Sequence, residues 1–444
     1  MKNYKYYLLF ITTFLLFTTS FGQKKLTLNE AISIALNSNT NLVKSQNTLL
    51  TTEASVKNAY GDLLPSLGIG GSWGWSRTND DGGTQLDFFG REQIIPASQI
   101  DSRSYSLSAS GNVTLFNGLS NYANIKQKET NLNSALFDLD KLKQDIILQT
   151  ASLYFSIISY ERLLKFQEEN YTYNKNLTDK IREMLDLNMI TVSDVYAQDV
   201  QTANSELAFL QAKNNYEKAK INLLKYLTLD ITGEYTFEAP QSVNFNYFDS
   251  RDDQTKLFEA ALKSRKDFQS QKLKLESAQY QLTISRSGLF PTVSGNYRYS
   301  TSAIRPGDLF NRRIFSMGLS LNFSIFSGWN TEFAIQSAEV QIKNATEDLN
   351  ALEKEIRAQV KNTLLDLETA KTQVEVTNKS LISARLNWNM KRENYELGSA
   401  TFIEMQQSYR DYLQAQNNDI QAQYSYFTKQ FELMNVLGRL NTEF

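Results

Sequence analysis

The sequence contains neither cysteine nor histidine among its 444 residues. The lack of cysteine excludes disulfides, thiol chemistry and a lipid-modified cysteine at the N-terminus. The lack of both residues removes the Ser-His and Cys-His nucleophile systems and the usual zinc ligands. Three acidic pairs remain, which a solvated surface explains better than glycosidase catalysis: Asp80-Asp81, Glu168-Glu169 and Asp252-Asp253. We therefore expect no enzymatic activity, no metal and no cofactor.

Strong net charge and long apolar runs are also missing. The formal net charge of −2 gives no electrostatic reason to bind nucleic acid. Beyond the N-terminal region no apolar stretch of about 18 residues occurs, so we expect no transmembrane helix, and a location in a membrane would require a β-barrel. Lys2 and Lys5 precede the short apolar run 8–17, which indicates that residues 1–22 are an export signal. The alternative is an N-terminal membrane anchor.

Proline and glycine are absent, or nearly so, from two long stretches. Residues 119–229 contain neither, and residues 329–437 contain only Gly398. Such stretches predict long helices. The glycines gather instead in 61–118 and 288–328, where we expect strands and loops.

The two helical stretches belong to an internal duplication. The second half aligns with the first at an offset of 210 positions, so that Phe116 matches Phe326 and Tyr216 matches Tyr426. Each half is predicted to run helix, strand, loop, strand and long helical hairpin. The expected segments are a first repeat over 23–229, a linker over 230–253 and a second repeat over 254–444, with helices over 28–63 and 254–289 and strands over 66–78, 104–116, 292–301 and 313–326.

Apolar and small polar residues alternate along all four expected strands. Successive side chains of a strand point to opposite faces, so one face is apolar and the other carries Ser, Gly and Asn. A soluble sheet would also alternate, but its solvent face usually carries Lys, Glu and Thr. The pattern and the strand length favour transmembrane strands around a water-filled lumen. The aromatic residues expected at the lipid interface are Trp73, Trp75, Tyr297 and Tyr299.

Four strands are too few to close a membrane barrel, because single-chain barrels begin at about eight strands. An open edge in lipid would leave backbone groups unpaired, at several kcal/mol each. We therefore expect an α+β membrane protein in which each chain contributes part of a shared, oligomeric barrel.

Each long stretch carries apolar residues at three- and four-residue steps, the spacing of coiled coils. A helix of about 65 residues at ~1.5 Å per residue would be roughly 100 Å long, far longer than a membrane is thick. Each stretch is predicted to reverse once, at 187–195 and 397–405. Gly398 tolerates a positive φ, as does Asn188 at the matching position. The candidate N-caps of the returning helices are Thr191, Ser193 and Thr401.

The sequence after 1–22 resembles the TolC-like outer membrane efflux protein family over nearly its whole length. The motifs that carry the resemblance are Leu26–Ala31, Leu63–Leu67 with its partner Gly288–Thr292, Leu115–Gly118 with its partner Ile325–Gly328, and the turns 187–191 and 395–401. The resemblance implies a homotrimer in the Gram-negative outer membrane, with twelve strands in one β-barrel continued by a long periplasmic α-helical barrel. It also implies the passive exit duct of a tripartite efflux pump or type I secretion system. Such a duct docks a periplasmic adaptor and an inner-membrane transporter (RND, ABC or MFS).

The resemblance further implies functional residues at the periplasmic end. The turns would dock the adaptor through Leu187, Asn188, Met189, Ile190, Thr191, Leu397, Gly398, Ser399, Ala400 and Thr401. The closed constriction maps onto Asp194, Glu404 and Gln407, with Tyr395 retained. Carboxylates converging from three chains would favour cations and make the gate pH-sensitive. Gln407 and Ala400 depart from the acidic and basic residues found there in some members, and the two acids can instead be explained as first-turn helix residues.

A coiled-coil structural or adhesin-like protein without a pore is the remaining alternative. It accounts for the helices but not for four amphipathic strands. The cargo is left open, since drugs, metal ions, dyes and secreted proteins would all fit a wide duct.

Overall fold

The computed structural model describes residues 24–239 and 254–440. The expected export signal over 1–22 and most of the expected linker over 230–253 lie outside the described residues. The chain forms two compact units. The sheet unit consists of Asn47–Asp138 and Asp267–Leu352, and the hairpin unit consists of the described residues of Met1–Gln46, Leu139–Lys266 and Glu353–Phe444. Two long helices, α4 (Ser120–Asp186) and α8 (Asn330–Glu396), contribute residues to both units.

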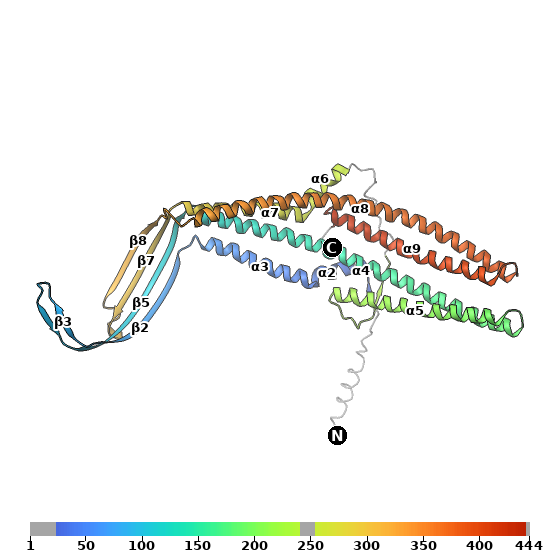
Figure 1. Cartoon of the computed structure of the whole chain (residues 1–444), viewed down its shortest axis with the longest axis horizontal. Coiled ribbons are helices and arrows are strands. Elements are labelled where there is room, and N and C mark those ends of the chain that lie inside the picture. The colour runs from blue at the N-terminus through green and yellow to red at the C-terminus, as the bar shows by residue number, and fades with distance from the viewer. Residues whose placement is uncertain (1–23, 240–253, 441–444) are drawn as a thin grey trace, which may run out of the picture. The chain divides into compact units, whose positions relative to one another are not determined.

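The largest sheet of the sheet unit is antiparallel and has four strands (Figure 1). Its order is β2-β5-β7-β8, and the strands are β2 (Ser66–Asp80), β5 (Ser98–Asn117), β7 (Thr292–Ala303) and β8 (Arg313–Asn322). The pairing of β5 with β7 joins the two halves of the duplication. This order leaves β2 and β8 as edge strands, each with one unpaired side.

The register brings the apolar residues of all four strands to the same face of the sheet. Leu67 pairs with Gly111, Gly111 with Tyr297, and Tyr297 with Met317. Small polar residues meet on the opposite face, where the hydroxyl oxygens of Ser72 and Ser106 lie 2.7 Å apart. The apolar face is open, since Trp73, Trp75 and Tyr299 are exposed and Tyr297 is half-buried. The predicted alternation is therefore confirmed across strands as well as along them.

The strand ends differ from the expected ones. β8 ends at Asn322 instead of 326, because its neighbour β7 begins at Thr292, the partner of Asn322, and offers no hydrogen bonds beyond it. β2 and β5 are longer than expected, because they continue to pair with each other up to Asp80 and Ser98. A further hairpin of β3 (Gly83–Leu86) and β4 (Glu92–Ile95), which was expected to be loop, extends this ribbon.

Both of the shorter helical segments are interrupted, whereas a single helix was expected in each. The segment 28–63 forms α2 (Leu28–Ser38) and α3 (Thr40–Gly61), because Asn39 is extended (ψ 123°) and its Oδ1 accepts the N–H groups of Asn41 and Leu42. The segment 254–289 forms α6 (Gln254–Ser264), α7 (Lys266–Arg286) and a 3-10 turn at Ser287–Leu289, with the break at Arg265. The backbone of Gly438 lies against this break, where an added Cβ would come within 2.9 Å of Arg265 N.

Two helical hairpins dominate the hairpin unit. α4 is followed by α5 (Val192–Tyr226) and α8 by α9 (Phe402–Val436), and both hairpins reverse at the same end of the unit (Figure 1). Their core includes the fully buried side chains of Ile147, Tyr154, Phe155, Ile158, Leu223 and Leu227. The two long antiparallel hairpins predicted from the sequence are thereby confirmed. No helix in the described parts of the chain is both long and apolar enough to cross a membrane.

A short parallel strand pair that was not predicted packs on this core. It joins β1 (Lys24–Leu26) to β6 (Tyr235–Phe237). The buried Tyr154 hydroxyl fixes the pair, since it lies 2.9 Å from the Leu26 carbonyl oxygen and accepts the N–H of Glu238 at 3.0 Å. Burial raises the pKa of Tyr154 to about 12, so this hydroxyl stays protonated.

Candidate functional site

The two helical turns repeat the same backbone geometry. Asn188 and Gly398 adopt the left-handed conformation, with φ of 58° and 74°. The N–H of Met189 donates to the Met184 carbonyl at 2.9 Å, and the N–H of Ser399 donates to the Asn394 carbonyl at 2.8 Å. These bonds satisfy carbonyls that the end of a helix would otherwise leave unpaired. The prediction that Asn188 and Gly398 carry the reversals is confirmed.

Each returning helix begins with a capping box. Thr191 caps α5: its hydroxyl accepts the Asp194 N–H, while the Asp194 carboxylate accepts the Thr191 N–H at 3.0 Å. Thr401 and Glu404 repeat the arrangement at the start of α9, with a carboxylate distance of 2.9 Å. Of the candidate caps, Thr191 and Thr401 are therefore confirmed and Ser193 is not the cap. Both acids expected at the constriction also have this local role.

The Glu404 carboxylate has a second partner across the turn. Lys391, on α8, donates to Glu404 Oε1 at 2.9 Å. The Thr401 backbone N–H and then Lys391 lower the pKa of Glu404 to about 2. This carboxylate is thus ionised at neutral pH. Position 400 is Ala and supplies no basic residue, but Lys391 and Glu404 form an ion pair within the same hairpin.

Tyr395 and Gln407 occupy different environments. The Tyr395 ring packs on Phe402 with a centroid distance of 5.7 Å, and burial followed by the nearby Asp194 charge raises its pKa. Tyr395 therefore lies between the two hairpins. Gln407 is exposed on α9, where its amide donates to Asp411 at 2.9 Å and accepts from Arg410 at 2.8 Å. Of the four expected constriction residues, three lie near the turns. The fourth, Gln407, lies further along α9 on its exposed surface.

The tips themselves present apolar side chains to the outside. Leu187 is 70% exposed and Leu397 is 81% exposed, and Met189 is exposed beside them. Ile190 and Ala400 are half-buried against the turns. Exposed apolar residues on a rigid turn favour a protein partner.

A buried polar ladder behind the turns was missed in the sequence. Gln198 is fully buried and donates to the Asn174 carbonyl at 3.2 Å, and it accepts from Gln406 at 2.6 Å. Tyr409 donates to the side chain of Asn170 at 2.9 Å. The ladder links α4 and α5 to α9 through hydrogen bonds instead of apolar packing. Its sequence signature is the four-residue spacing of Asn170 and Asn174 on the coiled-coil face.

Aromatic rings pack next to this ladder. Trp388 stacks on Tyr412 at 5.1 Å and meets Tyr173 edge-on at 5.9 Å, while Arg392 lies over Trp388 at 5.0 Å. Burial raises the pKa of the neighbouring Tyr409 far above its usual value. The cluster is a packed contact between the two hairpins and contains no acid–base pair suited to catalysis.

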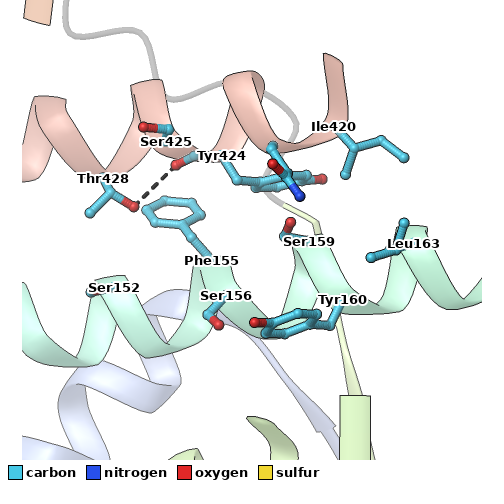
Figure 2. A pocket seen from close by; sticks show the side chains of 11 residues that line it. Ser152, Phe155, Ser156, Ser159, Tyr160, Leu163, Ile420, Tyr424, Ser425 and Thr428 are labelled. Atoms are coloured by element: carbon cyan, nitrogen blue, oxygen red, sulfur yellow. Dashed lines mark hydrogen bonds between the residues drawn. The ribbon is translucent and has the colours of Figure 1, made fainter. Parts of the chain in front are cut away.

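A groove runs between α4 and α9 in the hairpin unit (Figure 2). Its volume is about 290 Å³, and Figure 2 shows Ser156, Ser159 and Tyr160 on one wall and Tyr424 and Thr428 on the other. The Thr428 hydroxyl is already bonded to the Tyr424 carbonyl at 3.1 Å. The groove is at the small end of the range for ligand pockets and has no convergent charged groups. Among the described residues, no cluster of acidic side chains could hold a metal ion.

Comparison with known proteins decides the family. The family model described as outer membrane efflux protein matches residues 31–228 and 257–439. The chain belongs to the outer membrane efflux protein family. It is therefore an exit duct of efflux systems in the Gram-negative outer membrane, with a periplasmic part, and the adhesin-like alternative is not favoured.

Curated relatives and solved structures agree with this membership. Outer membrane protein TolC of Salmonella enteritidis is 20% identical over 403 residues, which cover 87% of this chain and 77% of TolC. Outer membrane efflux protein BepC of Brucella suis is 20% identical over 333 residues, covering 75% and 72%. The Campylobacter jejuni CmeC outer membrane channel superposes with a TM-score of 0.80 at 16% identity, over 93% of this chain and 85% of CmeC. VceC of Vibrio cholerae gives a TM-score of 0.78 at 15% identity, over 93% and 96%. Outer membrane efflux proteins of this fold are channels.

Proposed function

We propose that three copies of this efflux protein assemble into one duct with a twelve-stranded transmembrane barrel. The observation that carries the proposal is the four-stranded sheet, whose apolar face is open and whose edges β2 and β8 are both unpaired. Pairing β2 of one copy with β8 of the next would remove every edge, as a bilayer requires. The polar face, with its serine pairs, would then line the lumen.

The helical hairpins would continue the duct into the periplasm and carry its docking end. The exposed turns 187–191 and 397–401 would contact a periplasmic adaptor, which couples the duct to an inner-membrane transporter of a tripartite efflux pump or type I secretion system. Cargo would pass through passively. Trp73, Trp75, Tyr297 and Tyr299 would lie at the lipid interface, where aromatic side chains are enriched.

The constriction would form where Asp194, Glu404 and Tyr395 gather near the turns, with Gln407 next along α9. Three copies would bring six carboxylates towards one axis, which favours cations in the closed channel. Support comes from the positions of the three residues at the same end of the hairpin unit and from the ionised state of Glu404.

Charge removal at the constriction tests this function. Asp194→Asn with Glu404→Gln keeps an oxygen that can accept the capping bonds but removes the charges. In planar bilayers the double variant should conduct more at rest, and block by a trivalent cation should weaken by about tenfold, which corresponds to ~1.4 kcal/mol. The matched control is Glu30→Gln, which alters the capping box of α2 instead. Equal conductance and block in the double variant and the wild type would refute the constriction, and an absence of any pore would refute the duct.

A further inference from the structure

The ribbon of β2 and β5 projects past the rest of the sheet. The pairing of β5 with β7 stops at Tyr105↔Ala303, whereas β2 and β5 stay paired from Gly74↔Ser104 to Asp80↔Ser98. At about 3.3 Å per residue this adds roughly 20 Å. The β3–β4 hairpin then continues beyond the end of β2 (Figure 1). The segment 80–97 thus stands clear of the sheet, at the end where β7 and β8 are also connected.

The tip of this acidic hairpin, residues 80–97, presents two aromatic rings. Phe88 is 98% exposed and Phe89 is 79% exposed. The turn is ordered, because the Asp87 carboxylate accepts the N–H groups of Phe89 and Arg91 at 2.9 Å each. The charged residues of the hairpin are Asp80, Asp81, Asp87 and Glu92 against Arg91 alone. A rigid, acidic and apolar tip is suited to a partner that is basic and apolar.

The connection between β7 and β8 has the complementary character. This basic loop, residues 304–313, includes the first residue of β8. It contains Arg305, Arg312 and Arg313 against Asp308 alone, and all three arginines are exposed. None of them makes an ion pair within the described chain. Ile304 and Phe310 are also exposed, by 76% and 59%. The loop therefore combines unpaired positive charge with an uncovered apolar surface.

We propose that the acidic hairpin of each copy docks on the basic loop of the adjacent copy, at the outer mouth of the duct. The inference rests on the proposed trimer. The acidic hairpin extends from the edge strand β2, and the basic loop leads into the other edge strand, β8. Closing the barrel pairs these edges between copies, which brings the hairpin of one copy beside the loop of the next. Opposite charges and exposed Phe residues on both sides make the two surfaces complementary.

Two observations favour the adjacent copy over other occupants. The hairpin does not cover the loop of its own chain, since Phe88, Phe89 and Phe310 are all exposed. An anionic lipid surface is disfavoured, because the hairpin carries four acids and one arginine. Three such contacts would form a ring that narrows the outer mouth and that loosens as salt screens the charges.

Cross-linking tests the contact, and the absence of native cysteine makes it specific. Phe88→Cys and Phe310→Cys in the same chain, treated in the native outer membrane with a short bismaleimide, should give covalent dimers and trimers on a denaturing gel. A link within one chain would leave the mass of a monomer. Phe88→Cys alone should remain monomeric, and dimers from this single variant would show instead that the hairpins meet each other, which overturns the proposal.

Charge reversal tests whether opposite charges hold the hairpin and the loop together, independently of where the two cysteines are placed. In the double-cysteine background, Arg312→Glu with Arg313→Glu should lower the cross-linking yield by about fivefold, the scale of exposed ion pairs. Adding Asp81→Lys with Glu92→Lys should restore it. The mass of each variant in detergent is measured in parallel. A trimer that does not cross-link, or whose cross-linking yield is unchanged by both charge reversals, would overturn the docking but not the proposed duct. A monomer in detergent would contradict the proposed function itself.

Discussion

The Glu404 carboxylate accepts hydrogen bonds from the Thr401 N–H and hydroxyl on one side and from Lys391 on the other. A carboxylate with these partners favours its charged form, which is why its pKa falls to about 2. The threonine contacts follow from the spacing Thr-x-x-Glu and could be predicted from sequence. The contact with Lys391 could not, because thirteen positions and a reversal of the chain separate the two residues.

The lowered pKa sets the pH window of the α8–α9 turn. Because the folded pKa lies below the usual 4.5, the stabilisation by Glu404 is fully present above about pH 4.5 and is lost as the pH falls through about 2. A nitroxide on Ser399→Cys should therefore keep constant mobility from pH 5 to 8 and gain mobility in strong acid. Glu404→Gln should remove this acid transition. A transition of the wild type near neutral pH that Glu404→Gln abolishes would contradict the assignment.

At the scale of elements, the two helical turns show that different residues can adopt the same left-handed backbone conformation. Gly398 has φ of 74° and open space around the position of a Cβ, whereas Asn188 holds the same conformation with a side chain. Only the backbone preference disfavours a side chain at position 398, since a Cβ on Gly398 would meet no neighbouring atom within 4 Å.

Gly398→Ala should therefore destabilise the α8–α9 hairpin by about 1–2 kcal/mol, the cost of a left-handed residue with a Cβ. Asn188→Gly is the matched control and should change stability by less than about 1 kcal/mol, because glycine adopts this conformation freely. Thermal and urea unfolding of the detergent-solubilised protein measure both effects. A neutral Gly398→Ala would show that the turn relaxes to another conformation.

Element boundaries show where local pattern is insufficient. The break between α2 and α3 depends on the Asn39 side chain, which caps α3. An asparagine in a polar helical segment does not by itself show that it caps a new helix. The interruption at Arg265 lies against Gly438, which is distant in sequence. β8 ends where β7 stops offering partners. The last two boundaries are set by a neighbouring element and not by the segment itself.

At the scale of the whole molecule, the two faces of the sheet decide which side would meet lipid in the proposed barrel. Leu319 lies on the apolar face opposite Gly295, and the adjacent Ser320 lies on the polar face opposite Ser294. If the proposed barrel forms, Leu319→Arg should cost about 2–4 kcal/mol in the folded membrane protein, whereas Ser320→Arg should cost far less because its side chain would enter the aqueous lumen of that barrel. Urea-dependent folding into lipid vesicles gives the two free energies. Equal costs would contradict the assignment of the faces.

The sequence alone determined the properties that depend on neighbours along the chain. Strand alternation, coiled-coil spacing, the capping threonines and the reversals at Asn188 and Gly398 all arise from contacts within a few residues, so they could be predicted. The tertiary structure alone decided the order β2-β5-β7-β8, the Lys391–Glu404 pair and the buried ladder around Gln198. These features bring together residues that are far apart in the chain, and their energies depend on distances and burial that exist only once the helices and strands have packed.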